Sequence, residues 1–390
     1  MQTIGQAWLV LKLTNSGTAL GLVTALQFLP VLFLGAMGGV IADRLSKRKI
    51  LFFTQTASGI LALILGILVA TNVVQLWMIY ILAASLGFIN AIDNPTRRTF
   101  ILEMVGNKEL RNAITLFSTV FNLSRVIGPA IAGGIIAGFG LASCFLINAA
   151  SYLAVLVCLF LMRKKELYVV EPVKRAKGQL REGIKYVYNT PLLRNVLLMM
   201  AIIGTLTYEF QVNLPLIAKF TFKGGAEYFA FLNSAMGIGA VIGGLATASR
   251  KRTTARGLIK TAFGFGAAIV IASLSPSFHF ALFAMFLVGI FSIMFTSQGD
   301  TILQLESAPN MRSRVVALWS VAFLGSTPIG GPIIGLIGEY ASPRWSLATS
   351  GIAAIIAGIF GLITLWNYSS KKSSEQIPQP APVIEQDKEP

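Results

Sequence analysis

Two charged residues interrupt long apolar stretches of this sequence: Arg125 and Glu209. If these stretches cross a bilayer, a charge at the membrane centre costs about 2.5–3.5 kcal/mol, so each residue is expected to face a cavity or a partner. Glu209 is the better candidate proton carrier, because removal from water favours the neutral form of a carboxyl group. Arg125 is suited to attracting an anionic ligand or coupling to a carboxylate. The alternative for Glu209 is a place at the membrane interface, because Pro215 and the predicted edge of the span follow within about two helical turns.

A second group of charges lies where one apolar stretch ends and the next begins. The charged residues after Gly38 and Gly39 are Asp43, Arg44, Lys47, Arg48 and Lys49. Further along, Asp93 and Arg97 are four residues apart, so a helix would place them on one face. Charges in such positions can form contacts between helix ends, or they can simply anchor helices at the membrane surface.

Enzyme chemistry is not supported by the residue types present. The chain has one histidine and two cysteines, Cys144 and Cys158. It contains no His-Glu-x-x-His pair, no cysteine cluster and no glycine-rich phosphate loop that ends in Gly-Lys-Ser or Gly-Lys-Thr. We therefore expect no catalytic residue, no metal, no cofactor and no coupling to ATP hydrolysis by this chain.

The composition indicates which elements position these residues. Hydrophobic residues make up 55% of the chain and charged residues only 12%, and the mean hydropathy is +0.72. Many apolar runs reach the length of about 20 residues that a helical membrane span needs, which predicts a polytopic all-α membrane protein. The predicted spans are about 19–43, 51–70, 76–96, 112–138, 141–162, 193–218, 227–249, 257–274, 279–303, 313–338 and 345–366.

The two ends of the chain and its middle differ from these spans. Residues 1–12 are apolar but too short for a full span, so we expect an upstream start or a truncated first span. Residues 163–192 form a polar connection, in which residues 174–189 read as a basic amphipathic helix on the membrane surface. Residues 367–390 are rich in Lys, Ser, Gln and Pro, which predicts a disordered tail.

The distribution of Lys and Arg predicts the orientation of the spans. The connections at 44–50, 97–111, 163–194, 250–260, 304–314 and 367–390 hold 27 of the 32 Lys and Arg residues. Cytoplasmic connections carry such an excess, so these connections and the C-terminus are expected in the cytoplasm and the protein in the cytoplasmic membrane. The net charge of +16 is explained in this way, and we expect a lipid bilayer rather than nucleic acid as the partner.

The chain also repeats itself. Gly38-Gly39 reappears as Gly243-Gly244, and Gly128-Pro129 reappears as Gly331-Pro332 at an offset of 203 residues. The similar offsets of 205 and 203 residues predict two homologous halves, a six-helix bundle at 1–162 and another at 193–366. Parallel repeats of this kind build secondary transporters whose binding site lies between the halves.

These motifs resemble those of a known family. The stretch 38–49 resembles the loop signature of the major facilitator superfamily, G-x-x-x-D-R-x-G-R/K-R/K, and Ser46 replaces its usual glycine. The matching residues are Gly39, Asp43, Arg44, Lys47 and Arg48. The stretch from Gly128 to Gly134 resembles the fifth-span signature of exporters, with one extra residue before the paired glycines. Residues 93–134 resemble the branch called transmembrane secretion effectors, which includes enterobactin-type siderophore exporters and macrolide efflux proteins.

The resemblance covers the chain to about residue 366 and implies the major facilitator fold. This fold has two pseudo-symmetric six-helix bundles, the first of which here has a truncated first helix. It also implies that Arg44 pairs with Asp93 and that Asp43 faces the start of the eleventh span near Ser313. These contacts would form a latch that holds the halves together on the cytoplasmic side. Arg97 is included in this latch because it lies one helical turn from Asp93. The alternative is that these charges only anchor helices.

Two further groups of residues complete the predicted site. Gly128, Pro129, Gly331 and Pro332 allow bends and close approach of helices, which would control motion between the halves or reflect ordinary small-residue packing. The residues predicted to take part in proton coupling or to line the substrate cavity are Arg125, Glu209, Asn122, Tyr208 and Gln211. Polar side chains such as Asn122 and Gln211 also join helices without any role in transport.

The sequence therefore favours a secondary active transporter that works by alternating access as a monomer. We expect proton-coupled export of a small amphipathic molecule, such as a drug or a siderophore. Two alternatives remain open at this point. One is an uncoupled facilitator or importer of a small metabolite, and the other is an inactive form that lacks part of its first span.

Overall fold

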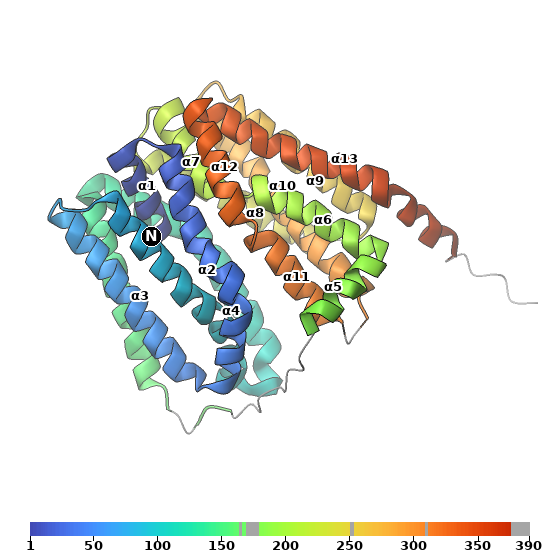
Figure 1. Cartoon of the computed structure of the whole chain (residues 1–390), viewed down its shortest axis with the longest axis horizontal. Helices are drawn as coiled ribbons and strands as arrows, with labels where there is room; N and C mark the ends of the chain where they lie inside the picture. The colour runs from blue at the N-terminus through green and yellow to red at the C-terminus, as the bar shows by residue number, and fades with distance from the viewer. Residues whose placement is uncertain (164–165, 169–178, 250–252, 309–310, 376–390) are drawn as a thin grey trace, which may run out of the picture.

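A computed structural model of the chain describes residues 1–163, 166–168, 179–249, 253–308 and 311–375. Within these ranges, the side chains of residues 35–44, 107, 111, 179–180, 313, 324 and 366–375 lie outside the described part. All regular elements of the described residues are helices (Figure 1). The predicted all-α class is therefore confirmed.

Four helices make up the first half of the chain. They are α1 (Gln2–Thr14), α2 (Gly17–Arg44), α3 (Lys47–Ala70) and α4 (Leu76–Leu161). The long α4 contains three predicted spans, because its path turns at Gly106 and at Gly140, which have φ values of 68° and 84°. The connection predicted at 97–111 is helical on both sides of Gly106. This differs from the prediction because a helix can continue beyond the hydrocarbon region, where polar side chains reach water.

The second half begins with a short connecting helix and continues with helices that cross the bundle. The connecting helix is α5 (Gln179–Asn189). The helices that follow are α6 (Pro191–Leu206), α7 (Phe210–Leu216), the π-helical turn η2 (Ile217–Thr221), α8 (Ala226–Ala248), α9 (Ala255–Ser273), α10 (Phe278–Glu306), α11 (Arg312–Leu324), α12 (Thr327–Tyr340) and α13 (Pro343–Glu375).

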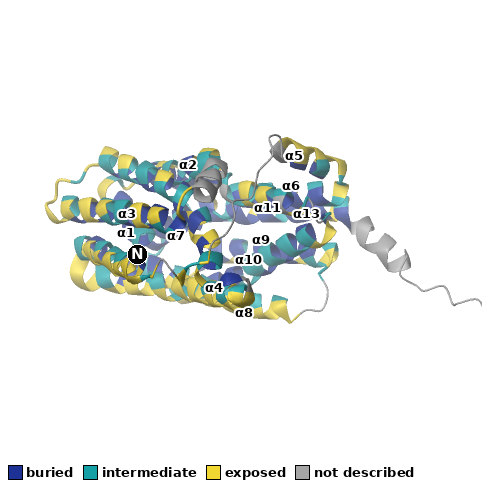
Figure 2. Cartoon of the chain, turned by 90° about the horizontal axis from the view of Figure 1, so that it is seen from below, coloured by how far each residue is buried: buried dark blue, intermediate teal, exposed yellow. Residues whose placement is uncertain are grey.

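Ten stretches of the described residues are long and apolar enough to cross a membrane. One of them, residues 108–161, covers two predicted spans separated at Gly140. With the shorter α1, these stretches give the twelve predicted helices. The outside of the bundle fits a lipid environment, because large apolar side chains such as Phe53, Phe160 and Ile363 are exposed there. Exposed residues lie along α4 and α8, whereas buried residues gather where helices pack on one another (Figure 2).

Two of the predicted spans contain a break in the helix. The predicted span 193–218 is interrupted at residues 207–209, between α6 and α7, and the predicted span 313–338 is interrupted at residues 325–326, between α11 and α12. Both stretches are nevertheless long and apolar enough to cross a membrane, as the sequence predicted. The two breaks lie side by side, because a Cβ placed on Gly204 would lie 2.5 Å from the Ala322 carbonyl oxygen and 3.0 Å from the Ser326 Oγ.

A buried polar network makes the break in the seventh span possible. In a membrane, backbone groups freed by unwinding need partners within the protein. The Ser350 hydroxyl donates to the Leu206 carbonyl oxygen at 2.7 Å, and the Thr207 hydroxyl donates to the Ser350 carbonyl oxygen at 2.8 Å. The Asn213 amide donates to Ser350, and Ser346 donates to Asn213. Side chains of α13 thus replace part of the hydrogen bonding that the unwound turn gives up.

Two predicted segments near the ends of the halves are described only in part. Helix α5 covers residues 179–189 of the predicted surface helix, and residues 174–178 lie outside the described residues. Helix α13 continues to Glu375, so residues 367–375 of the predicted disordered tail are helical. Residues 376–390 lie outside the described part of the chain, and the predicted domain boundaries stay predictions.

Replacement of Gly106 by alanine tests the turn within α4. The φ and ψ of Gly106, 68° and −179°, lie in a region that only glycine adopts readily. We expect Gly106→Ala to lower the free energy of unfolding by about 1–3 kcal/mol, measured by thermal unfolding of the purified protein in detergent. Gly138→Ala is the matched control, because Gly138 is also in α4 and a Cβ there would meet nothing within 4 Å. Equal unfolding temperatures for the two variants would contradict the prediction.

Candidate functional site

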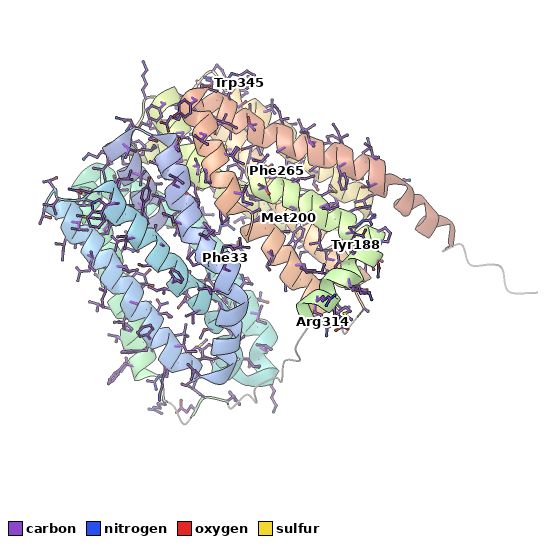
Figure 3. The ribbon with its side chains drawn as sticks, in the orientation of Figure 1. Phe33, Tyr188, Met200, Phe265, Arg314 and Trp345 are labelled. Carbon is purple, nitrogen blue, oxygen red and sulfur yellow. The ribbon has the colours of Figure 1, made fainter. Side chains whose placement is uncertain are left out.

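The two ends of the bundle differ in charge. We call the end formed by residues 45–49, 97–106, 159–163, 166–168, α5 and residues 307–308 and 311–314 the basic end. The opposite end, with the turns at residues 14–17 and 340–343, is the neutral end. Arg314 and Tyr188 lie at the basic end and Trp345 at the neutral end (Figure 3).

The loop signature contributes two cations to the basic end, and both bind within the first half. Lys47 forms a partly buried ion pair with Glu103 of α4. Arg48 donates to the carbonyl oxygens of Leu159 and Phe160 at 2.7 and 2.9 Å. These carbonyls end α4, where a cation is stabilised by the helix dipole. Lys47 and Arg48 therefore fix α3 against two parts of α4, and their described contacts do not reach the second half.

Asp93 is also held within the first half. Its carboxylate is 2% exposed and forms an ion pair with Arg97, which lies one turn away on the helix face that the spacing predicted. The other carboxylate oxygen accepts hydrogen bonds from Thr54 at 2.6 Å and from Gln55 at 2.8 Å. The side chains of Gly39, Asp43, Arg44 and Ser313, which the predicted latch needs, lie outside the described residues. The latch therefore stays a prediction.

The two halves meet most closely where α2 crosses α12. A Cβ on Gly21 would collide with the Gly331 carbonyl oxygen and lie 2.9 Å from the Pro332 Cα. One turn closer to the neutral end, a Cβ on Gly17 would lie 2.5 Å from the Gly335 carbonyl oxygen, and one on Gly335 would collide with Gly17. Two Gly-x-x-x-Gly faces thus bring the backbones into contact, as small-residue faces do in membranes. Of the predicted residues, Gly331 and Pro332 lie at this crossing.

Glu209 lies beside this crossing. It follows the unwound turn of the seventh span and is only 1% exposed. Its carboxylate oxygens point at the glycine pair of α12, since Cβ atoms on Gly330 and Gly331 would lie 2.9 and 3.5 Å from them. The Thr327 hydroxyl lies beside the carboxylate, yet Oε1 has no hydrogen-bond partner among the described residues. Glu209 is thus a buried carboxyl group without an ion pair to any described side chain.

The predicted Gly128 of the fifth span is less closely packed than the glycines at the crossing of α2 and α12. A Cβ on Gly128 would meet nothing within 4 Å, and Pro129 next to it is only partly buried. The close contact is made by Gly133, where a Cβ would collide with Ala230 of α8. Further along the same pair of helices, the Ser234 hydroxyl donates to the Val126 carbonyl oxygen at 3.0 Å. The fifth and eighth spans therefore form a second crossing between the halves, and Gly128 lies outside it.

Three other predicted residues are placed apart from Glu209. The Tyr208 hydroxyl donates to the Ser292 carbonyl oxygen at 2.9 Å, and its ring packs on Phe265 and Phe323 inside the second half. Arg125 is exposed on α4. Asn122 is exposed as well and donates to the carbonyl oxygen one turn earlier in its own helix. Gln211 lines a cleft with residues of α1 and α2.

Two charged residues of the second half cap the α1–α2 turn at the neutral end. Glu339 of α12 accepts hydrogen bonds from the Ser16 hydroxyl at 2.6 Å and the Thr18 backbone N–H at 2.9 Å, at the start of α2. Lys219 donates to the Leu11 carbonyl oxygen at the end of α1 and to the Asn15 side chain, both at 2.6 Å. Each side chain carries a charge of opposite sign to the partial charge of the helix end that it binds.

These contacts close the neutral end. Within the described part of the chain, the hydrogen bonds that join the halves are those of Glu339, Lys219 and Ser234. Sequence reasoning missed Glu339 and Lys219, because nothing in their local pattern shows which helix ends they reach. It also missed Gly17 and Gly21, although their spacing of four residues, matched by Gly331 and Gly335, was a readable signal.

Comparison with known proteins identifies relatives of this arrangement. A family model described as transmembrane secretion effector matches residues 1–389. The chain is 26% identical to the enterobactin exporter EntS of Escherichia coli over 340 residues, which cover 86% of this chain and 80% of that protein. It is 29% identical to the staphyloferrin A transporter of Staphylococcus aureus over 241 residues, 61% of this chain. This second match spans 60% of the relative's length.

Solved structures resemble the fold at low sequence identity. A bacterial homologue of the human lysosomal transporter Spinster, in an inward-facing and occupied conformation, matches with a TM-score of 0.70 at 15% identity, covering 95% of this chain and 93% of that one. A peptide transporter in complex with sulfate matches with a TM-score of 0.72 at 13% identity, covering 94% and 92%. These likenesses confirm the predicted transporter fold with its two bundles.

Replacement of Gly21 by alanine tests the crossing of α2 and α12. The added methyl group would collide with backbone rather than with a flexible side chain, so we expect the halves to separate at the neutral end. Spin labels at Val73 and Leu274, in a background without Cys144 and Cys158, would report a longer distance by pulsed electron resonance. Gly244→Ala is the control, because a Cβ there meets nothing within 4 Å. An unchanged distance distribution in Gly21→Ala would contradict this prediction.

Removal of the Glu339 carboxylate tests the polar closure of the neutral end. We expect Glu339→Leu to destabilise the closed arrangement by about 0.3–1 kcal/mol, the range of exposed helix-end charges, which is about a two- to fivefold shift in population. The measurement is the rate at which a membrane-impermeant thiol reagent modifies Ala19→Cys, a position that is 6% exposed. Tyr340→Phe, at the neighbouring exposed residue, should leave the rate unchanged. If Glu339→Leu does not raise the rate of thiol modification, the glycine contacts alone close this end.

Proposed function

The chain belongs to the transmembrane secretion effector family of the major facilitator superfamily, and we propose that it exports a small amphipathic molecule in exchange for protons. That it is a multi-pass membrane transporter, related to siderophore exporters and not to an enzyme family, follows from the family match. Direction, coupling ion and substrate are our proposal. The names of the relatives, an enterobactin exporter and a staphyloferrin A transporter, support export of siderophore-like molecules.

The position of Glu209 carries the proposal of proton coupling. A charge buried without a cation is costly, because the protein replaces only part of the lost hydration. A proton is the smallest ligand that removes this charge. The carboxyl group lies against Gly330 and Gly331, and Gly331 is also a contact point of α2 on α12. A change in the charge of Glu209 therefore acts directly on the surface along which the halves separate.

The charge distribution supports an orientation with the basic end in the cytoplasm. The contacts of Glu339 and Lys219 would then close the outer side, as expected of a state that receives its substrate from the cytoplasm. In this state the substrate would enter from the cytoplasm. Opening of the neutral end would expose Glu209 to protons from outside and release the substrate there, which makes export and proton uptake parts of one cycle.

The test is substrate efflux from energised cells that lack their own pumps. We expect Glu209→Gln to lower gradient-driven efflux of dyes or siderophores at least tenfold, while exchange of substrate across the membrane without a gradient continues. The retained exchange distinguishes loss of coupling from loss of folding or binding. Glu166→Gln is the control, because Glu166 lies on the exposed connection, paired with Arg163, and should export like the unchanged protein.

Three outcomes would separate this proposal from its alternatives. Efflux by the unchanged protein that survives a protonophore would indicate an uncoupled facilitator. Efflux that a protonophore stops equally in the unchanged protein and in Glu209→Gln would keep proton coupling but assign it to another residue. Accumulation of the substrate in energised cells, in place of loss, would show an importer.

A further inference from the structure

The short helix α5 presents an exposed face at the basic end, and Figure 2 shows this helix at the edge of the bundle. Four exposed side chains make up this face, which we call the outer face of α5: Arg181, Ile184, Lys185 and Tyr188. Their spacings of three and four residues place them in one stripe along the helix. Two large apolar side chains beside two cations are typical of a helix that lies in the interface of a membrane.

The opposite side of α5 is fixed to the second half. Gly183 packs against α11, since a Cβ there would lie 3.0 Å from the Arg314 Cβ. Arg314 also forms an ion pair with Glu182 at 2.7 Å (Figure 3). The Tyr186 hydroxyl accepts a hydrogen bond from the Ala308 backbone N–H at 3.1 Å. These contacts hold the outer face in one orientation, away from the second half.

The charge of the outer face is positive. Glu182 is the only carboxylate of α5, and it is engaged by α11. Neither Arg181 nor Lys185 forms an ion pair with a described residue. A third cation lies beside them, because the guanidinium carbon of Arg194 in α6 is 5.7 Å from the centroid of the Tyr188 ring. The outer face and Arg194 are therefore complementary to an anionic partner.

The course of α6 indicates that this partner is a lipid. Leu198 is 45% exposed on α6, and Arg194 precedes it by four residues on the same side of the helix. Because α6 begins a membrane-spanning stretch, Leu198 contacts hydrocarbon and Arg194 lies about 6 Å nearer to the membrane surface. Tyr188 follows beside Arg194. An apolar side chain below a cation and a tyrosine is the order expected along the acyl chain and headgroup of a phospholipid.

We propose that the outer face of α5, together with Arg194, binds the headgroup of an anionic phospholipid. Lys185 lies one turn from Tyr188, so Arg194 and Lys185 flank this ring and donate to the phosphate oxygens. Ile184 and Tyr188 enter the interface beside the upper part of the acyl chains. A zwitterionic headgroup brings a cation of its own to the same place, so a headgroup with net negative charge binds more tightly.

The bound lipid would also act on α11. Glu182 and Tyr186 join α5 to the start of α11 and to the connection before it. A lipid that holds α5 in the interface therefore restrains this end of the second half. The inference concerns the membrane partner of the chain and does not depend on the proposed substrate or coupling ion.

The test titrates the purified full chain in detergent with dioleoyl phosphatidylglycerol and with dioleoyl phosphatidylcholine, which share their acyl chains and differ in net charge. Native mass spectrometry measures the lipid that stays bound. We expect phosphatidylglycerol to bind at least about tenfold more tightly, since each cation at a lipid surface contributes about a fivefold gain in affinity. Lys185→Gln and Arg194→Gln should each weaken its binding about fivefold.

The matched control is Arg163→Gln. Arg163 is also an exposed cation of the basic end, but it is paired with Glu166 and lies outside α5. Its replacement removes the same charge and should leave the affinity for phosphatidylglycerol unchanged. All three variants should unfold at the temperature of the unchanged protein, because they replace side chains at the surface. A loss of affinity in Lys185→Gln or Arg194→Gln then reports the lipid contact and not a loss of folding.

A second measurement reports what covers the outer face. A fluorophore is attached at Ile184→Cys, in a background without Cys144 and Cys158, and the protein is placed in vesicles of phosphatidylcholine and phosphatidylglycerol. We expect a nitroxide carried on the lipid headgroup to quench the fluorophore, and iodide in the water to quench it weakly. A fluorophore at Tyr168→Cys, an exposed position of the basic end outside α5, should show the reverse.

Several results would overturn the inference. Equal affinities for the two lipids, or unchanged affinity in both Lys185→Gln and Arg194→Gln, would exclude the lipid site. An equal loss in Arg163→Gln would show diffuse attraction by the charge of the basic end. Displacement of the lipid by inorganic phosphate would indicate a site for a free anion. Strong quenching at Ile184→Cys by iodide alone would show a face open to water, suited to an acidic soluble protein instead.

Discussion

The arrangement of the two halves depends on backbone contact between α2 and α12. Gly17, Gly21, Gly331 and Gly335 have no side chains, so the two helices approach until carbonyl oxygens of one helix meet α-carbons of the other. In a bilayer, helices gain little from the hydrophobic effect when they associate, and such close packing is the main attraction between them. The contact does not tolerate a larger residue at these glycines, because even a single methyl group would occupy space filled by backbone. It can therefore open or close as a unit and does not deform gradually.

The buried carboxyl group owes its position to an unwound turn beside this contact. If the seventh span were a continuous helix, its residues 207–209 would use their backbone groups within the helix. The polar side chains of Ser346, Ser350 and Asn213 accept and donate in place of the missing helix bonds, which allows the chain to turn Glu209 towards α12. A break in the eleventh span packs against this turn. Discontinuous helices are the parts of transporter folds that form ion and substrate sites.

The described charges near the basic end of the first half bind within that half. Lys47 and Arg48 bind Glu103 and the end of α4, and Asp93 is held by Arg97, Thr54 and Gln55. These contacts make the basic end of the first half rigid. Among the described side chains, the charges that join the two halves are Glu339 and Lys219 at the neutral end, and each binds a helix terminus rather than an opposite charge. A helix terminus is a fixed partner, so only one side chain must be ordered for each contact.

The sequence by itself determined the helical class, the number of spans, the repeat of the two halves and the position of Asp93 and Arg97 on one helix face. All of these follow from local periodicity, apolar length and spacing along one chain. Only the tertiary structure decided that Glu209 is buried against Gly330 and Gly331, and that Gly128 is open while Gly133 is packed. It also decided where the seventh and eleventh spans break, because the groups that compensate the unwound turn come from α13, more than 130 residues away. Spacing within a sequence reports neighbours on the same helix, whereas the partners that define this site lie on helices from both halves.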